Sequence, residues 1–129
     1  MTFYEKEIHR IGRKVYVNQS QINAVIRTRR YLENNYGANS NLNYLSSVGA
    51  VSKYHLLRLF KRYYGLTPTQ YVTDKRIGKA KEHLKDGMSV TQTCFAVGFQ
   101  SLGSFSTLFK RKTGKSPYQY QKEQLSRSI

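Results

Sequence analysis

Apolar residues recur at helical spacing along most of the chain, and one such pattern occurs twice. Within residues 52–65 the spacing i, i+3, i+4, i+7 predicts a helix that buries one face. The apolar positions of that helix are Leu56, Leu59, Phe60 and Tyr63. Shifting the sequence by 49 positions aligns 48–71 with 97–120 without a gap, and 11 of the 24 aligned residues are identical. A self-match of this length predicts one structural module used twice.

Each copy predicts a short helix, a glycine turn and a second helix, which is the order of a helix-turn-helix. In the first copy a helix from Leu42 to Val48, with Leu45 also inward, precedes the turn at Gly49, and Ser52 caps the second helix. The second copy repeats this order with Ser89, a helix over 90–97, Gly98, Ser101, Phe105, Leu108, Phe109 and Gly114.

A long helix is predicted between the two copies. Gly65 ends the preceding helix, and Thr67, Pro68 and Gln70 supply an N-cap, a first-turn proline and a capping box. The helix continues to about Lys85. Its predicted core residues are Tyr71, Ile77, Ala80 and Leu84.

The two ends of the chain are predicted with less regular structure. Residues 1–19 are interpreted either as a basic tail with little fixed structure or as a short strand over 13–17, and Ser20 caps a leading helix that ends at Gly37. That helix is expected to bury Ile22, Val25, Ile26, Leu32 and Tyr36. Ser116, Pro117 and Gln119 repeat the capping box and open a short last helix, after which 125–129 is predicted to fray.

The predicted fold is therefore all-α, with about seven helices in two helix-turn-helix lobes joined by a long linker helix. The predicted layout is an N-terminal basic tail at 1–19, the first lobe at 20–66, the linker helix at 67–86, the second lobe at 87–124 and a C-terminal tail at 125–129.

Charge narrows the functional class. The chain has 22 Lys+Arg against 7 Asp+Glu, a net charge of +15, which predicts a polyanionic partner or an acidic membrane surface. The membrane is disfavoured because the basic helices already use their apolar faces for core packing. No long apolar run predicts a transmembrane helix or secretory signal, so the cytoplasm is the expected compartment.

Catalytic and metal-binding chemistry has no positive support in the sequence. The one cysteine, Cys94, has no disulfide partner in the chain and is expected to be buried and inert. His9, His55 and His83 are scattered, and no pair of carboxylates has a nearby nucleophile. We therefore predict no enzyme activity, no metal and no cofactor.

These residues resemble the DNA-binding domain of the AraC/XylS family of bacterial transcription regulators over roughly 22–123. The resemblance lies in the runs 45–61, 71–84 with Arg76, and 90–117. It implies a sequence-specific regulator of double-stranded promoter DNA, an activator that contacts RNA polymerase on the nucleoid. Each lobe would place its second helix in one of two adjacent major grooves, about 34 Å apart. An effector or dimerisation domain is implied if the chain is part of a longer regulator.

Outward residues near the start of each second helix are the candidates for base contact. In the first lobe they are Lys53, Tyr54, Leu57 and Arg58, and in the second Gln100, Leu102, Gly103, Ser104, Ser106 and Thr107. Arg58 can bind a guanine edge or only a phosphate, and Leu57 can contact thymine methyl groups or lie partly in the core. The candidates for phosphate contact are Ser52, Lys61, Thr67, Ser101, Lys110, Arg111 and Ser116.

The short side chains of the second copy predict unequal lobes. Gly103 and Thr107 stand where the first copy has Tyr54 and Arg58, and they cannot reach as far. We expect the first lobe to carry most base-specific contact and the second mainly to anchor. An architectural nucleic-acid-binding protein with little sequence preference is the alternative, and a protein-interaction module is a third hypothesis.

Overall fold

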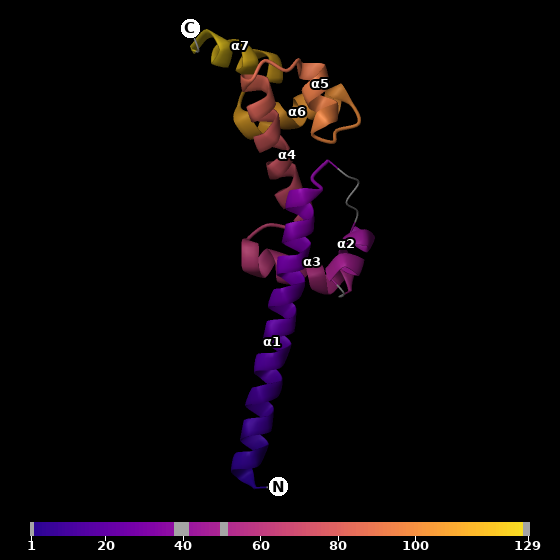
Figure 1. Ribbon diagram of the computed structural model, residues 1–129, viewed down its shortest axis with the longest axis vertical. Coiled ribbons are helices and arrows are strands. Elements are labelled where there is room, and N and C mark those ends of the chain that lie inside the picture. The colour runs from indigo at the N-terminus through magenta and orange to yellow at the C-terminus, as the bar shows by residue number, and fades with distance from the viewer. Residues whose placement is uncertain (1, 38–41, 50–51, 128–129) are drawn as a thin grey trace. The chain divides into compact units, whose positions relative to one another are not determined.

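The computed structural model describes residues 2–37, 42–49 and 52–127, which contain seven helices and no strand (Figure 1). The helices are α1 (Phe3–Asn34), α2 (Leu42–Gly49), α3 (Lys53–Tyr64), α4 (Pro68–Lys85), α5 (Val90–Ala96), α6 (Leu102–Thr113) and α7 (Pro117–Arg127). The predicted all-α fold is confirmed, with α2–α3 and α5–α6 as the two helix-turn-helix pairs.

The chain forms two compact units whose boundaries fall inside or at the ends of helices. The first comprises Met1–Leu32 and Asn41–Pro68, and the second comprises Glu33–Ser40 and Thr69–Ile129. The long helix α4 therefore belongs to the second unit from Thr69 onward. The end of α1 also belongs to the second unit, whereas the sequence assigned the whole leading helix to the first lobe.

The interpretation of residues 1–19 as a tail or a strand is wrong, because α1 already begins at Phe3. Its start is a capping box in which the Thr2 amide donates to Glu5 Oε2 at 3.1 Å and the Glu5 amide donates to Thr2 Oγ1 at 3.2 Å. Ser20 consequently lies inside α1 instead of capping it. The Thr-x-x-Glu spacing was the sequence signal for this helix start.

The first unit has its core between α1, α2 and α3. The buried residues there are Ala24, Val25, Thr28, Leu32, Leu45, Leu56, Leu59 and Phe60. Tyr63, predicted to face inward, is 42% exposed. The half-buried tyrosine is Tyr64, whose ring lies 4.8 Å from that of Phe60, because Tyr64 continues the i, i+4 row from Phe60. The inward positions predicted for Leu42 and Val48, and the turn at Gly49, lie outside the residues whose side chains are described.

The second unit packs α4, α5, α6 and α7 around one core. Its buried members are Ile77, Ala80, Leu84, Cys94, Val97, Phe105 and Phe109. Tyr71 is half-buried instead of being a core residue, since its hydroxyl donates to Glu33 Oε1 at 2.6 Å, and Val72 beside it is buried. Burial of this apolar set is the main stabilising contribution, at about 25 cal/mol per Å² removed from water.

The C-terminal segment is more ordered than predicted, because α7 continues to Arg127. Its start is capped as expected, with the Gln119 amide donating to Ser116 Oγ at 3.1 Å. Further along, the Gln121 side-chain amide donates to the carbonyls of Leu84 at 3.1 Å and Met88 at 2.6 Å. These bonds tie α7 to the end of α4 and explain why residues 125–127 remain helical.

Candidate nucleic-acid interface

The second helices of the two pairs, α3 and α6, have the same type of N-cap and the same type of C-terminal glycine. Ser52 accepts the His55 amide at 3.2 Å, and Ser101 accepts the Ser104 amide at 3.2 Å, so each serine is an N-cap. Gly65 and Gly114 end α3 and α6 in the left-handed conformation, with φ of 74° and 83°. The backbones of the two candidate reading helices are thus fixed in equivalent ways.

The outer face of α3 is basic, aromatic and exposed. Lys53, Tyr54, Arg58 and Lys61 all lie in solvent, while Leu56, Leu59 and Phe60 hold the opposite face in the core. Tyr54 is 69% exposed, and the Lys53 ammonium lies 5.5 Å from the centre of its ring. The structure therefore brings the predicted first-lobe candidates together on one accessible face.

Leu57 lies between these two faces. It is half-buried, which supports the interpretation that it belongs partly to the core. Its exposed part still borders Tyr54 and Lys61 along the helix, since residues three and four positions away adjoin it on the surface. Leu57 can therefore contact an apolar group only at the edge of the α3 face.

The outer face of α6 is equivalent by the repeat to the outer face of α3, but its side chains are much smaller. Gln100, Leu102, Gly103, Ser104 and Thr107 are exposed. Ser106, predicted to be outward, is half-buried because it occupies the position equivalent to Leu57. A shallow depression crosses this face, lined by Gly103, Ser104, Thr107, Leu108 and Arg111. Leu108 was expected only in the core, and the absence of a side chain at Gly103 is the signal that could have placed it here.

The predicted phosphate-binding residues divide into cations and caps. Lys61, Lys110 and Arg111 are exposed near the C-terminal ends of α3 and α6. Ser52, Ser101 and Ser116 are N-caps whose oxygens already accept backbone amides, which leaves each hydroxyl hydrogen to donate. Thr67 is half-buried just before α4.

A close glycine contact fixes the turn before α6. Gly98 has φ 101°, and a Cβ built on it would lie 2.7 Å from the Gly37 Cα. Only glycine tolerates both the backbone conformation and this approach. The predicted turn glycine is therefore confirmed, and Gly37, which follows α1 instead of ending it directly, supplies the surface that the turn touches.

Arg76 braces the same turn from α4. Its Nε donates to the Tyr36 carbonyl oxygen, and its guanidinium lies 5.7 Å from the centre of the Phe99 ring. Burial lowers the pKa of Arg76 from its ordinary value. This side chain connects the end of α1, the linker helix and the turn that precedes α6.

The core beneath α5 contains two polar side chains. Cys94 is buried, its Sγ lies 3.5 Å from the Ser101 carbonyl oxygen, and burial raises the pKa of its thiol. The expected burial of Cys94 is confirmed, and a raised pKa disfavours the reactive thiolate. Thr93 Oγ1 is buried without a hydrogen-bond partner, and we have no functional account of it.

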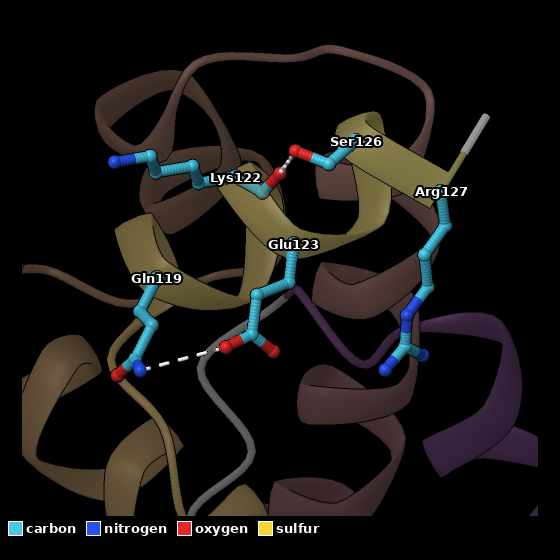
Figure 2. Close-up of a pocket in the computed structure, with 5 residues that line it drawn as sticks. All are labelled: Gln119, Lys122, Glu123, Ser126 and Arg127. Carbon is cyan, nitrogen blue, oxygen red and sulfur yellow. Dashed lines mark hydrogen bonds between the residues drawn. The ribbon is translucent and has the colours of Figure 1, made fainter. Parts of the chain in front are cut away.

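A second shallow depression lies along α7, and none of the predicted site residues lines it (Figure 2). It is lined by Gln119, Lys122, Glu123, Ser126 and Arg127. Ser126 Oγ donates to the Lys122 carbonyl at 2.9 Å, and the Gln119 side-chain Nε2 donates to Glu123 Oε1 at 3.5 Å. A hydrogen bond from Lys115 lowers the pKa of Glu123. These polar groups form hydrogen bonds with their neighbours on or next to α7, which is typical of a surface helix stabilised by its own side chains.

Within the described residues, no group of three or more His, Cys, Asp and Glu side chains is arranged to hold a metal ion. In the same part of the chain, no helix combines the length and apolar character needed to span a membrane.

Comparison with known proteins identifies what this arrangement is similar to. The family model described as a helix-turn-helix domain, of the AraC type, matches residues 45–123. The probable transcriptional regulator LumQ of Photobacterium leiognathi is 34% identical over 125 residues, covering 94% of this chain and 44% of LumQ. The transcriptional activator RhaS of Escherichia fergusonii is 42% identical over 69 residues, 53% of this chain and 25% of RhaS.

The fold itself has close counterparts among solved structures. The DNA-binding domain of AdpA, a global transcriptional factor crystallised with a target DNA, superposes with a TM-score of 0.77 and 21% identity, covering 81% of this chain and 96% of that domain. At this identity the likeness concerns the fold. The chain spans between a quarter and about half of the length of the curated relatives it matches.

Proposed function

Because the chain belongs to the AraC/XylS family of helix-turn-helix transcription regulators and is therefore a DNA-binding regulator, we propose that it is a sequence-specific activator that reads two adjacent major grooves of promoter DNA. In this proposal α3 and α6 each enter one groove, with α3 supplying most contacts to base edges and α6 mainly holding the backbone. The sites are about one helical turn, or about 34 Å, apart on one face of the duplex.

The observation that carries the proposal is the exposed face of α3. Arg58 lies free of the core on a helix whose opposite side is fixed by Leu56 and Phe60. The exposed guanidinium of Arg58, on a helix fixed by its buried face, can donate two parallel hydrogen bonds to guanine O6 and N7. Lys53 and Tyr54 flank it with a cation and an aromatic ring, which suit a phosphate and a thymine methyl group or sugar.

The phosphate contacts follow from charge and helix ends. Lys61, Lys110 and Arg111 are exposed where the α3 and α6 helices end, and the N-termini of α4 and α7 offer backbone N–H groups beside Thr67 and Ser116. A net charge of +15 adds a strong, salt-dependent attraction to DNA. We therefore expect affinity to fall steeply as salt is raised.

The activator role is supported by one relative, and contact with RNA polymerase belongs to the same proposal. RhaS, which shares 42% identity over 69 residues, is described as a transcriptional activator. Since the chain covers only part of such relatives, the regulated genes and any effector domain belong to this proposal as well. The bound protein would act on the nucleoid in the cytoplasm.

Selection of bound sites from a random duplex pool tests the proposal directly. We expect an enriched motif with one well-defined half and one degenerate half, bound with nanomolar affinity. Arg58→Ala should lose preference at one or two base pairs of the defined half. Selection that returns no motif, with equal affinity for all duplexes at every salt concentration, would contradict sequence-specific reading.

An architectural role is the second candidate, favoured by the α6 face. Gly103 and Thr107 leave a depression instead of projecting side chains, and such a surface suits shape and phosphate contact more than base readout. The same selection distinguishes the two, because an architectural protein would enrich for flexible steps or for nothing.

A further inference from the structure

Residues 33–37, which comprise the end of α1 and the turn after it, are held in the second unit by side chains of α4. The Tyr71 hydroxyl donates to Glu33 Oε1 at 2.6 Å, and Arg76 Nε donates to the Tyr36 carbonyl oxygen. The Tyr36 ring also packs, partly buried, against the core of that unit. These partners are 38 and 40 positions apart in the sequence, so the segment is placed by tertiary contacts.

Arg76 joins this segment to the turn that precedes α6. Its guanidinium carbon lies 5.7 Å from the centre of the Phe99 ring while its Nε donates to the Tyr36 carbonyl. Tyr36 lies beyond Asn34, the last residue of α1, so its carbonyl oxygen is outside the hydrogen bonds of that helix. A guanidinium can make both contacts at once, because it is planar and combines fixed N–H donors with a face that stacks on aromatic rings.

The backbone of the turn meets the same segment directly. A Cβ built on Gly98 would lie 2.7 Å from the Gly37 Cα and 2.9 Å from the Gly37 carbonyl oxygen. Glycine at position 98 therefore lets the two stretches of backbone approach more closely than a side chain there would allow. The turn is thus fixed by a side chain of α4 and by the backbone of residues 33–37.

The position of this turn determines where α6 begins. The Phe99 ring lies 5.2 Å from the ring of Phe105, a fully buried residue of α6. Ser101, two residues after Phe99, accepts the Ser104 amide and is the N-cap of that helix. A displacement of Phe99 would therefore shift the first turn of α6, which carries the exposed candidate residues 102–104.

A charged residue is an unusual choice for holding a turn through packing alone. Arg76 is half-buried, and burial lowers its pKa because the charged form loses solvation. An apolar side chain of similar volume often serves packing equally well or better than a buried charge. What an apolar side chain cannot supply is the directed hydrogen bond to Tyr36 together with the planar contact on Phe99.

We propose that Arg76 is a positioning residue for DNA recognition by α6, which it controls by fixing the turn before that helix through Tyr36 and Phe99. It acts through the turn, so that the start of α6 meets the DNA backbone in one defined orientation. The inference rests on the proposed function, because it requires α6 to lie in a groove of the duplex.

Fluorescence anisotropy of the full chain on two duplexes tests this role. One is a selected site, and the other is the same site shortened to the half whose scrambling abolishes the effect of Arg58→Ala. Arg76→Met removes the donor and the planar group but keeps a long unbranched side chain. It should lower affinity for the full site about tenfold, or ~1.4 kcal/mol, and leave affinity for the shortened site unchanged.

Lys79→Met is the matched control for the lost charge. Lys79 lies on the same helix and pairs with Glu82 at 3.3 Å, so this variant should change both affinities by the same small factor. Arg76→Lys keeps the charge and a donor but lacks the planar group, and its affinity for the full site should lie between those of the native protein and Arg76→Met.

Two outcomes of the binding experiment separate this inference from the proposed function. Equal losses of Arg76→Met on the two duplexes, or no loss on the full site, would overturn the positioning role alone. A native protein that binds both duplexes equally well would contradict the entry of α6 into a groove, and with it the proposed function.

Amide hydrogen exchange gives a readout that does not depend on DNA. The Gly98 amide donates to the Phe95 carbonyl at 3.2 Å, and the Phe99 amide donates to the Cys94 carbonyl at 3.1 Å. Arg76→Met should speed exchange at these two amides at least about tenfold, through local opening of the turn, while the amides of α7 exchange as in the native protein. Uniform acceleration throughout α4–α7, or unchanged exchange at positions 98 and 99, would overturn the inference.

Discussion

The second helices of the two helix-turn-helix pairs, α3 and α6, share a buried phenylalanine and differ most at the exposed positions near their N-termini. Phe60 and Phe109 are equivalent by the repeat, and both are fully buried. Tyr54 and Arg58 are equivalent to Gly103 and Thr107, and all four are exposed. The serine caps and the terminal glycines match as well, and in the cores Leu56 is equivalent to Phe105, so the largest change in side-chain character lies on the surface that would meet a ligand.

This pattern separates what the fold requires from what recognition requires. Substitution in the core would cost stability in either copy, and both copies have a phenylalanine at the equivalent positions 60 and 109. Substitution on the outer face costs the fold little, and there the copies have diverged from a large cationic face to a shallow depression. The two units are thus one scaffold carrying two different surfaces.

The largest expected effect tests the shared core. Phe60→Ala and Phe109→Ala should each lower the free energy of unfolding by about 3–5 kcal/mol, because both remove a fully buried ring. Urea denaturation followed by circular dichroism measures this. A loss below ~1 kcal/mol at one position would break the equivalence of the two cores.

The glycines of the second unit test where the scaffold is most constrained. Gly114→Ala should lower the free energy of unfolding by about 1–2 kcal/mol, because φ is positive but the space around the Cβ is open. Gly98→Ala should cost more, since its Cβ would also meet Gly37. Thermal unfolding of the two variants ranks them, and an equal or smaller cost at Gly98 would show that the contact with Gly37 yields easily.

Substitutions on the outer faces test the unequal surfaces. Arg58→Ala should weaken binding to a selected site by about 1–3 kcal/mol and relax preference at one or two base pairs. Thr107→Ala, at the equivalent position of α6, should change affinity much less because its side chain is short. Fluorescence anisotropy with matched and mismatched duplexes measures both. Similar losses for the two variants would remove the distinction between the units.

The smallest expected effect concerns the caps that begin the two helices. Ser52→Ala and Ser101→Ala should each lower the free energy of unfolding by about 1 kcal/mol, because the amides of His55 and Ser104 lose their acceptor. Ser→Gly at either position is the matched control and should cost only a few tenths of a kcal/mol. Chemical denaturation would reveal any difference between the two caps, and a clear difference would indicate that the copies are not held alike.

Local rules in the sequence were sufficient where a single residue decides the structure. Ser52, Ser89 and Ser101 cap helices as predicted, and Gly98 and Gly114 take positive φ. Each of these features depends on the conformation of one turn, which side-chain chemistry specifies directly.

Features that depend on distant neighbours were not predictable in this way. Gly37 lies against Gly98, and Arg76 contacts both Tyr36 and Phe99. These contacts could not be predicted, because the sequence does not show which segments pack together. Tyr63 and Tyr64 follow Phe60 by three and four residues, and only the orientation of α3 decides which of them is turned toward the core of the first unit.

The candidate site could be predicted as a set of positions but not as a surface. The repeat identified which residues of α3 and α6 face outward, apart from Leu57 and Ser106, which are both half-buried. The depression at Gly103 is open and is lined by Leu108 and Arg111, and no local sequence pattern predicts which side chains border it. The helical start of α1 was missed because its capping residues lie in a stretch rich in charge.

Affinity measured on a selected duplex with each half-site scrambled in turn tests the unequal reading most directly. The half read by α3 is identified as the one whose scrambling abolishes the effect of Arg58→Ala. The account predicts that scrambling this half lowers affinity at least about 100-fold, because several mismatches at about 1–3 kcal/mol each are combined, while scrambling the other half changes it less than about tenfold. Equal losses from the two halves, or a larger loss from the half read by α6, would contradict it.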